Sequence, residues 1–166
     1  MTKEKDPYLE EDLREIVAEN EIDWEALAGC SVLVTGSTGL IGSLLVKALC
    51  MANQTLAFCK EKPIRVLALI RRRKKAKEVF GPLYTEEAFS CVVADLMQEE
   101  FAVEGEVDYI LHAAAQTASK EMVEHPVETI RTAVKGTEHL LALAAQKKVR
   151  GMVYLSSMEV YGSLLD

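Results

Sequence analysis

The sequence predicts an α/β fold with a doubly wound parallel sheet, and two observations lead to this prediction. Apolar runs alternate with helix-like segments from residue 31 onward. These runs, such as 66–70, lack the polar alternation of a half-exposed strand, which is typical of parallel strands buried on both faces. Because strand–helix–strand crossovers are right-handed, we expect the strand order 3-2-1-4-5 with a ligand at the carboxyl ends of the strands.

The expected elements alternate along the chain. The strands are expected at 31–35, 64–70, 90–94, 107–112 and 151–156. The helices between them are expected at 40–53, near 74–79 and near 127–147.

Composition excludes several classes of protein. The 166 residues are enough for one domain with a substantial core, and 49% of them are hydrophobic, as in a folded chain. The net charge of −7 argues against a general nucleic-acid binder. No apolar run reaches membrane-spanning length, and residues 1–5 lack the apolar core of a signal peptide. The four cysteines form no C-x-x-C pair, so we expect reduced thiols in a cytoplasmic protein and no metal site.

Residues 1–29 form a predicted N-terminal helical extension. Asp6-Pro7 is typical of a helix start, and 23–27 resembles a second short helix. We expect this segment to pack on the flank of a dinucleotide-binding unit at 30–166, and an arm that binds a partner is the alternative.

A glycine turn follows the first expected strand. The segment Thr35-Gly36-Ser37-Thr38-Gly39-Leu40-Ile41-Gly42 places three glycines in a G-x-x-G-x-x-G pattern between a strand and a helix. The first glycine permits a tight turn, the second lets backbone N–H groups approach a pyrophosphate, and the third allows close helix–strand packing. The helix N-terminus adds a partial positive charge. This context predicts a Rossmann-type site for NAD or NADP.

Residues at the ends of the second and third expected strands could contact the cofactor and determine whether NAD or NADP binds. Arg71 and Arg72 stand where an acidic residue would bind the ribose of NAD, so they favour NADP through contact with its 2′-phosphate, or they stack on adenine. Asp95 could accept a hydrogen bond from the adenine amino group while Leu96 covers the ring. A helix N-cap is the competing interpretation of Asp95.

Four ordered motifs together resemble the extended short-chain dehydrogenase/reductase superfamily. They are the glycine turn, Asp95-Leu96, His112-Ala113-Ala114-Ala115, and the segment 155–162, Leu-Ser-Ser-Met-Glu-Val-Tyr-Gly. Within this superfamily the chain is most similar to the nucleotide-sugar epimerases, dehydratases and decarboxylases. The segment 125–130 with Gly136-Thr137 also resembles the UDP-glucuronate decarboxylase branch.

The resemblance implies roles for further residues. Ala113, Ala114 and Ala115 would line the cofactor. Ser157 would hydrogen-bond the substrate hydroxyl that is oxidised, and Glu159 would act as an acid or base. The resemblance implies structural roles for Tyr161 and Gly162.

Three departures from the family pattern qualify these roles. Met158 replaces the Asp acid of one type of hexose 4,6-dehydratase, and Ala133 replaces the usual Asn of a T-N-x-x-G-T pattern. None of the five tyrosines is followed four residues later by lysine, so the family's Tyr-x-x-x-Lys pair is missing from this chain. We therefore expect an inactive cofactor-binding half of a longer enzyme, truncated before the substrate domain.

Three functional hypotheses remain at this point. The first is an enzyme portion whose longer parent binds a nucleotide sugar and oxidises a sugar carbon transiently. The second is a non-catalytic dinucleotide-binding regulatory module, and the third is an NADP-dependent reductase of a non-sugar carbonyl. Ser157 and Glu159 favour the first, the arginines after the second strand support the third, and self-association into a homodimer is left open.

Overall fold

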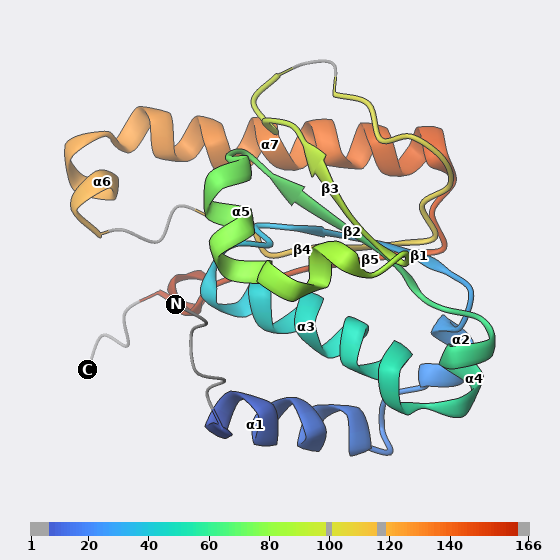
Figure 1. The fold of residues 1–166 in the computed structure, drawn as a ribbon. Coiled ribbons are helices and arrows are strands. Elements are labelled where there is room, and N and C mark those ends of the chain that lie inside the picture. Colours follow the sequence, from blue (N-terminus) through green and yellow to red (C-terminus); the bar gives the residue numbers. More distant parts are fainter. Residues whose placement is uncertain (1–6, 99–100, 116–118, 163–166) are drawn as a thin grey trace.

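A parallel sheet lies at the centre of the protein, with helices on both faces (Figure 1). The computed structural model describes residues 7–98, 101–115 and 119–162. Its strands are β1 (Ser31–Thr35), β2 (Arg65–Ile70), β3 (Phe89–Val93), β4 (Tyr109–His112) and β5 (Gly151–Tyr154). Neighbouring strands pair in parallel, in the order β3-β2-β1-β4-β5. The predicted fold class and strand order are confirmed.

The helices connect and cover these strands. In chain order they are α1 (Pro7–Ala18), α2 (Trp24–Leu27), α3 (Leu40–Thr55), α4 (Ala57–Glu61), α5 (Arg73–Phe80), η1 (Gly81–Thr85), α6 (Ser119–Glu124), α7 (Pro126–Lys147) and η2 (Met158–Tyr161). The three helices expected between the strands are present, with ends within two residues of the prediction. The sequence analysis did not anticipate α4, α6 or the two 3-10 turns.

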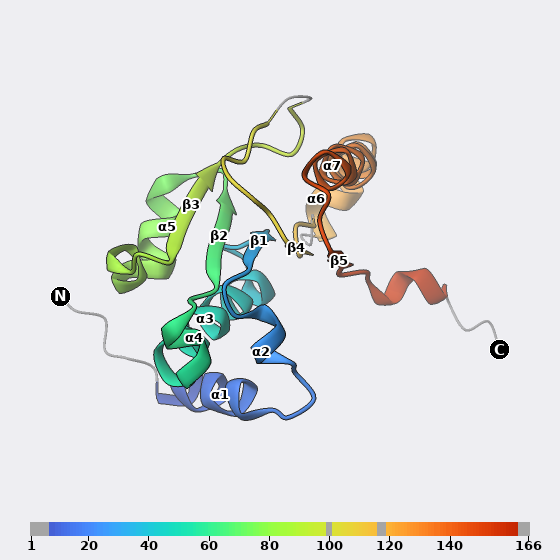
Figure 2. The ribbon, with the colours of Figure 1, turned by 90° about the vertical axis from the view of Figure 1, so that its right-hand side faces the viewer.

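The central strands bury side chains on both faces. In β1, Val32 and Val34 belong to one buried cluster, whereas Leu33 belongs to a second. The first cluster lies beside α3, and the second is closed by Leu140 and Leu143 of α7. Figure 2 shows α3 and α7 on opposite sides of the sheet. The continuous apolar runs of the central strands therefore reflect burial from two directions.

The edge strand β5 departs from this pattern. Met152 packs in the cluster beside α7, but Val153 points to the opposite face and is 56% exposed. The helices around α3 lie beneath β1 and β2 and do not extend to β5 (Figure 2). The expectation that every strand is buried on both faces is therefore wrong for β5.

The N-terminal segment shares the core beside α3. Val17 of α1 and Trp24 of α2 are each only 7% exposed and belong to the same buried cluster as Val46 and Leu49 of α3. Figure 1 shows α1 as the outermost layer beneath α3. This segment therefore packs on the flank of the sheet, although the division of the chain at residue 29 stays a prediction. Among the described residues, no helix has the length and apolarity needed to cross a membrane.

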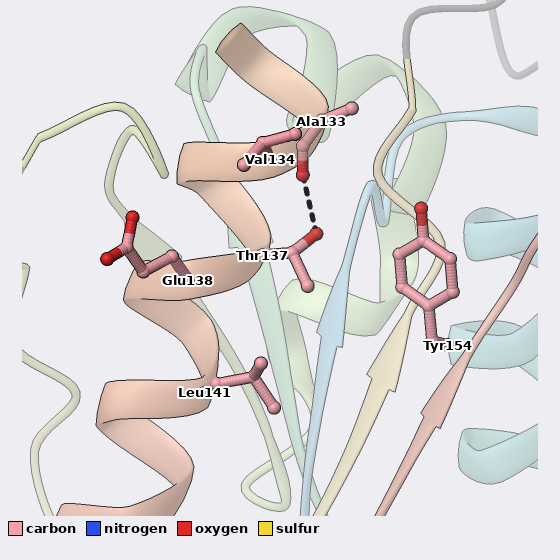
Figure 3. Close-up of a pocket in the computed structure, with 6 residues that line it drawn as sticks. All are labelled: Ala133, Val134, Thr137, Glu138, Leu141 and Tyr154. Atoms are coloured by element: carbon pink, nitrogen blue, oxygen red, sulfur yellow. Dashed lines mark hydrogen bonds between the residues drawn. The ribbon is translucent and has the colours of Figure 1, made fainter. Parts of the chain in front are cut away.

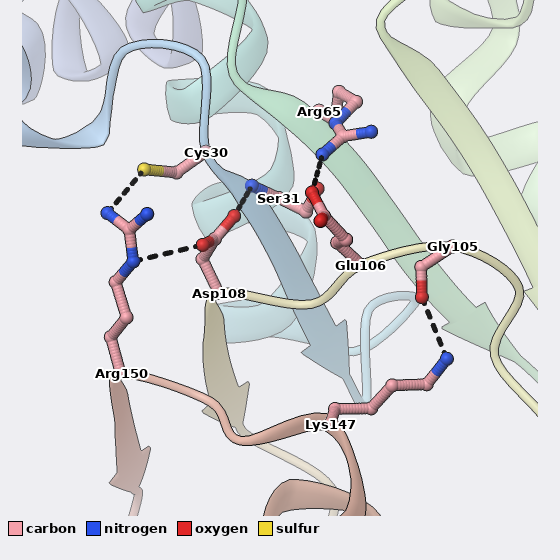
Figure 4. Close-up of polar contacts among 8 residues, drawn as sticks. All are labelled: Cys30, Ser31, Arg65, Gly105, Glu106, Asp108, Lys147 and Arg150. Atoms are coloured by element: carbon pink, nitrogen blue, oxygen red, sulfur yellow. Dashed lines mark hydrogen bonds and ion pairs between the residues drawn. The ribbon is translucent and has the colours of Figure 1, made fainter.

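A polar clasp, formed by Ser31, Asp108 and Arg150, joins the beginnings of three strands (Figure 4). The Asp108 carboxylate accepts a hydrogen bond of 2.8 Å from the Ser31 backbone N–H and pairs with Arg150 Nε at 3.0 Å. The Arg150 backbone N–H donates to the Asp108 carbonyl at 2.7 Å. The Arg150 guanidinium also approaches the Cys30 thiol at 3.5 Å. The clasp thus holds β1, β4 and β5 together at the edge opposite the glycine turn.

Loss of the Asp108 side chain should destabilise the protein more than loss of the Arg150 side chain, which removes the ion pair. Replacing Asp108 with Ala leaves the buried Ser31 N–H without an acceptor, which should lower the free energy of unfolding by about 1–3 kcal/mol. Arg150→Ala should have a smaller effect, because that side chain is 60% exposed and water screens the pair. Glu106→Ala, in an exposed pair with Arg65, is the matched control and should change little. Urea unfolding measures all three, and an equal loss for Asp108→Ala and Arg150→Ala would contradict this account.

Candidate functional site

The first glycine of the turn lies against the chain that follows β4. Gly36 has a φ of +63°, a left-handed conformation that side chains with a Cβ rarely adopt. A Cβ built on it would lie 2.5 Å from the Ala113 carbonyl oxygen and 2.7 Å from the Ala114 nitrogen. Only glycine therefore allows the loops after β1 and β4 to approach this closely.

The third glycine allows α3 to begin directly on the turn. A Cβ on Gly42 would collide with the Gly36 carbonyl group. Gly39 occupies the N-cap position without a side-chain hydrogen bond, and its N–H donates to the Gly36 carbonyl at 2.8 Å. No side chain caps the first turn of α3 and no acidic residue lies in it. Its N–H groups can therefore receive a phosphate group.

The side chains of the turn divide between the core and the surface. Ser37 is fully buried, and its hydroxyl donates to the Leu69 carbonyl at 2.7 Å, which ties the turn to β2. This hydroxyl is thus engaged in the fold, which leaves the Ser37 backbone for a ligand. Thr38 is half-buried, whereas Leu40 and Ile41 are exposed on the first turn of α3.

Two arginines lie at the carboxyl end of β2. Arg71 and Arg72 are exposed, and Arg72 precedes the first residue of α5. Within the described part of the chain, neither guanidinium forms an ion pair with a carboxylate. Both side chains are therefore available to a phosphate group at this edge of the sheet.

Asp95 and Leu96 form a turn after β3. Asp95 Oδ1 accepts a hydrogen bond of 3.0 Å from the Met97 N–H, and residues 96–98 form a turn and a bend instead of a helix. The N-cap interpretation of Asp95 is therefore wrong. Leu96 packs on Gly136 of α7, and its carbonyl oxygen lies 2.7 Å from His139 Nδ1. The segment after β3 thus contacts α7. The contacts of Asp95 and Leu96 with adenine stay predictions.

A buried network of polar groups links the ends of β1 and β4. Thr35 Oγ1 lies 2.6 Å from His112 Nδ1 and accepts a hydrogen bond of 3.3 Å from the Ala114 N–H. His112 Nε2 lies 3.2 Å from Thr137 Oγ1 on α7. The Thr137 hydroxyl donates to the Ala133 carbonyl at 2.7 Å. Ala113 and Ala114 are half-buried and Ala115 is exposed, and their contact with a cofactor stays a prediction.

The environment of His112 favours a neutral imidazole. The side chain is 3% exposed, and burial lowers the pKa of His112 below its usual value. Its ring lies edge-on to Tyr154 of β5, with 5.2 Å between the ring centroids. A buried, hydrogen-bonded histidine of this kind is poorly placed to take a proton from a substrate.

The predicted catalytic residues follow β5 at the same edge of the sheet. Ser157 is exposed three residues after β5, and its carbonyl accepts a hydrogen bond from the Val160 N–H. Glu159 lies in η2, but its side chain is outside the part of the chain that the structure describes. Tyr161, to which the resemblance gives a structural role, is 88% exposed, so it packs against little of the described chain.

An apolar groove lies between α7 and Tyr154 of β5 (Figure 3). Thr137 and Leu141 point from the helix toward the side on which Tyr154 lies. Ala133, where the family usually has asparagine, also lines this groove, and its carbonyl is occupied by Thr137. No amide side chain is thus available at position 133 for a proton relay.

The match to a family model covers most of the chain. The model of the NAD dependent epimerase/dehydratase family matches residues 32–166. The chain belongs to this family. The matched region contains every predicted site residue and all five strands except Ser31, the first residue of β1.

Several curated and solved relatives are named as enzymes of nucleotide sugars. A dTDP-glucose 4,6-dehydratase from Streptomyces antibioticus is 31% identical over 81% of this chain and 39% of its own length. UDP-glucuronic acid decarboxylase 1 from Arabidopsis thaliana is 29% identical over 81% of this chain and 28% of its own. A double-mutant dTDP-glucose 4,6-dehydratase from Streptomyces venezuelae, solved with NAD bound, has 26% identity and a TM-score of 0.63 over 80% of this chain and 41% of its own. The chain thus spans well under half the length of these relatives.

The two threonines that bracket His112 were not among the predicted site residues. Thr35 was considered only as part of the glycine turn, and Thr137 only as part of a motif. They lie 102 positions apart in the sequence and meet through His112 because β1 and β4 are neighbours. A hydroxyl residue directly at the end of a buried strand, next to a glycine, was the available signal for Thr35.

Gly36→Ala should destabilise the protein more than the same change at Gly105. Both glycines have positive φ, so alanine adds backbone strain of about 1–2 kcal/mol at either position. At Gly105 the new Cβ meets nothing within 4 Å, whereas at Gly36 it meets the Ala113 backbone. The difference between the two variants in thermal or urea unfolding therefore isolates the contact between the loops. Equal losses would show that this contact is not tight in solution.

Proposed function

We propose that this chain is the NAD(P)-binding portion of an enzyme that transforms a nucleotide sugar through transient oxidation of a sugar carbon. The close approach of Gly36 to the backbone after β4 carries the proposal, because it sets the glycine turn, our proposed phosphate cradle, at the carboxyl ends of β1 and β4. The uncapped N-terminus of α3 lies beside that cradle. A bound nicotinamide would supply the hydride acceptor and donor.

The glycine turn and the uncapped first turn of α3 would bind the pyrophosphate. Arg71 or Arg72 would bind the adenosine end, with Asp95 and Leu96 at the adenine. Ala113–Ala115 would leave room for the ribose and nicotinamide, since their side chains are small.

Ser157 and Glu159 would serve the sugar in this proposal. Ser157 would hydrogen-bond the hydroxyl that is oxidised, and Glu159 would hold or release a proton during the later step. This chain has no Tyr-x-x-x-Lys pair to act as the base. We therefore propose that these 166 residues bind the dinucleotide in the cytoplasm without turning over a nucleotide sugar.

Replacing Gly39 with Val should abolish dinucleotide binding while the fold persists. A Cβ on Gly39 would lie 3.1 Å from the Gly36 carbonyl, a tight but tolerable contact, and its branches would obstruct the approach to the turn. Isothermal titration calorimetry with NAD⁺ and NADP⁺ should show measurable binding to the unmodified chain and at least about tenfold weaker binding to the variant. Gly151→Val is the control, since that glycine begins β5 at the opposite edge of the sheet, has no positive φ, and a Cβ there would make an ordinary contact of 3.5 Å with the Tyr109 ring. Unchanged affinity in Gly39→Val would refute the phosphate cradle.

Cofactor choice should depend on the arginines after β2. If Arg71 or Arg72 binds a 2′-phosphate, NADP⁺ should bind at least as well as NAD⁺, and Arg71→Asp with Arg72→Asn should reverse the preference. Lys74→Asp with Lys75→Asn makes the same change in net charge on α5 and should leave the preference unchanged. A strong preference of the unmodified chain for NAD⁺ would refute the phosphate role and favour adenine stacking.

A further inference from the structure

The geometry of the polar network around His112 favours one neutral tautomer. The single hydroxyl hydrogen of Thr137 is donated to the Ala133 carbonyl, so Thr137 Oγ1 can only accept from His112 Nε2. Nε2 therefore carries the proton, and Nδ1 is left as an acceptor. The Thr35 hydroxyl donates to Nδ1 and still has a lone pair for the Ala114 N–H. Every group in the network is then satisfied.

This network determines the separation of two loops. Thr35 immediately precedes Gly36 in the chain. The Thr35 hydroxyl accepts a hydrogen bond from the Ala114 N–H, and this N–H belongs to the same peptide group as the Ala113 carbonyl that lies against Gly36. One buried hydroxyl thus orients the backbone on both sides of the contact. The direction of its hydrogen is set by His112.

We propose that neutral His112 is a positioning residue for the dinucleotide site, holding Thr35 so that the glycine turn and the Ala113–Ala115 segment stay in register. The proposal rests on the dinucleotide-binding function above. A proton added to Nδ1 would turn this acceptor into a donor. The Thr35 hydrogen would then lose its acceptor in a fully buried position, at a cost typical of an unsatisfied buried group.

The surroundings of His112 provide no charge that would compensate its protonation. Thr35 and Thr137, which contact the ring from β1 and α7, do not titrate in the accessible range. The Tyr154 ring packs against it from β5, and Glu138 is next to Thr137 on the exposed side of α7. Burial alone lowers the pKa of His112, so neither ionisable neighbour stabilises the imidazolium.

The linkage between protonation and stability has a definite sign. Since the folded-state pKa of His112 lies below its usual value of 6.5, its contribution to stability is complete above that pH. This contribution is lost as the pH falls through the folded-state pKa. Affinity for the dinucleotide should fall in the same range, by up to about tenfold for each pH unit below that pKa.

Calorimetric titration with NAD⁺ between pH 5.5 and 8 tests the proposal. His112→Asn keeps an acceptor for the Thr35 hydroxyl but cannot be protonated, so it should bind with a flatter pH profile than the unmodified chain. Comparison of the two profiles isolates the contribution of His112. Thr35→Val should weaken binding at every pH, whereas Thr35→Ser should restore it. Thr132→Val is the control, because that hydroxyl donates only to the Glu128 carbonyl on exposed α7.

A spectroscopic measurement tests the proposal without any ligand. With ¹⁵N-labelled histidine, long-range ¹H–¹⁵N correlation should show His112 as the Nε2–H tautomer at pH 7.5. The backbone amide signals of Gly36 and Ala114 should shift with the same midpoint as His112 when the pH is lowered. An Nδ1–H tautomer, or amide signals that do not follow His112, would overturn the proposal. Identical pH profiles for the unmodified chain and His112→Asn through the pH range in which the His112 NMR signals titrate would do the same, whereas NAD⁺ binding to neither would count against the proposed function alone.

Discussion

The contact between Gly36 and the backbone of Ala113 and Ala114 is the constraint on which the rest of the site depends. It brings together the loops after two neighbouring parallel strands, β1 and β4. Because Gly36 lies against the Ala113 backbone, the Thr35 hydroxyl can accept a hydrogen bond from the Ala114 N–H. The same hydroxyl contacts His112. Because Gly42 has no Cβ, α3 can begin directly against the same turn with its first N–H groups uncapped.

The contacts at the amino ends of the strands stabilise the fold, whereas the carboxyl ends are where we expect a ligand to bind. At the amino ends of the strands, Asp108 satisfies the Ser31 N–H and pairs with Arg150, so the polar groups there are paired within the protein (Figure 4). At the carboxyl ends, the first turn of α3 and the exposed arginines after β2 remain available to a ligand. A parallel sheet places all of its carboxyl ends at one edge, which is why the glycine turn and the segments after β2, β3, β4 and β5 lie at the same edge.

Much of this arrangement could be predicted from the sequence, because it depends on local patterns. The residues of β1 and the start of α3 follow directly from an apolar run that ends in the glycine turn. The hydrogen bond from Ser37 to Leu69 and the contact of the Leu96 carbonyl with His139 could not be predicted, since both depend on how distant backbone segments meet. The exposure of Val153 was missed for a related reason, because an apolar strand at an edge has the same sequence as one at the centre.

Mapping NAD⁺ binding onto the backbone amides of the ¹⁵N-labelled chain shows which edge of the sheet binds the dinucleotide. We expect the largest ¹H–¹⁵N shift changes on titration at the amides of residues 36–42 and 113–115. We also expect the amides of Ser31 and Arg150, at the opposite edge, to stay unchanged. Shift changes centred on the opposite edge, or on α1, would contradict the assignment of the glycine turn as the dinucleotide site.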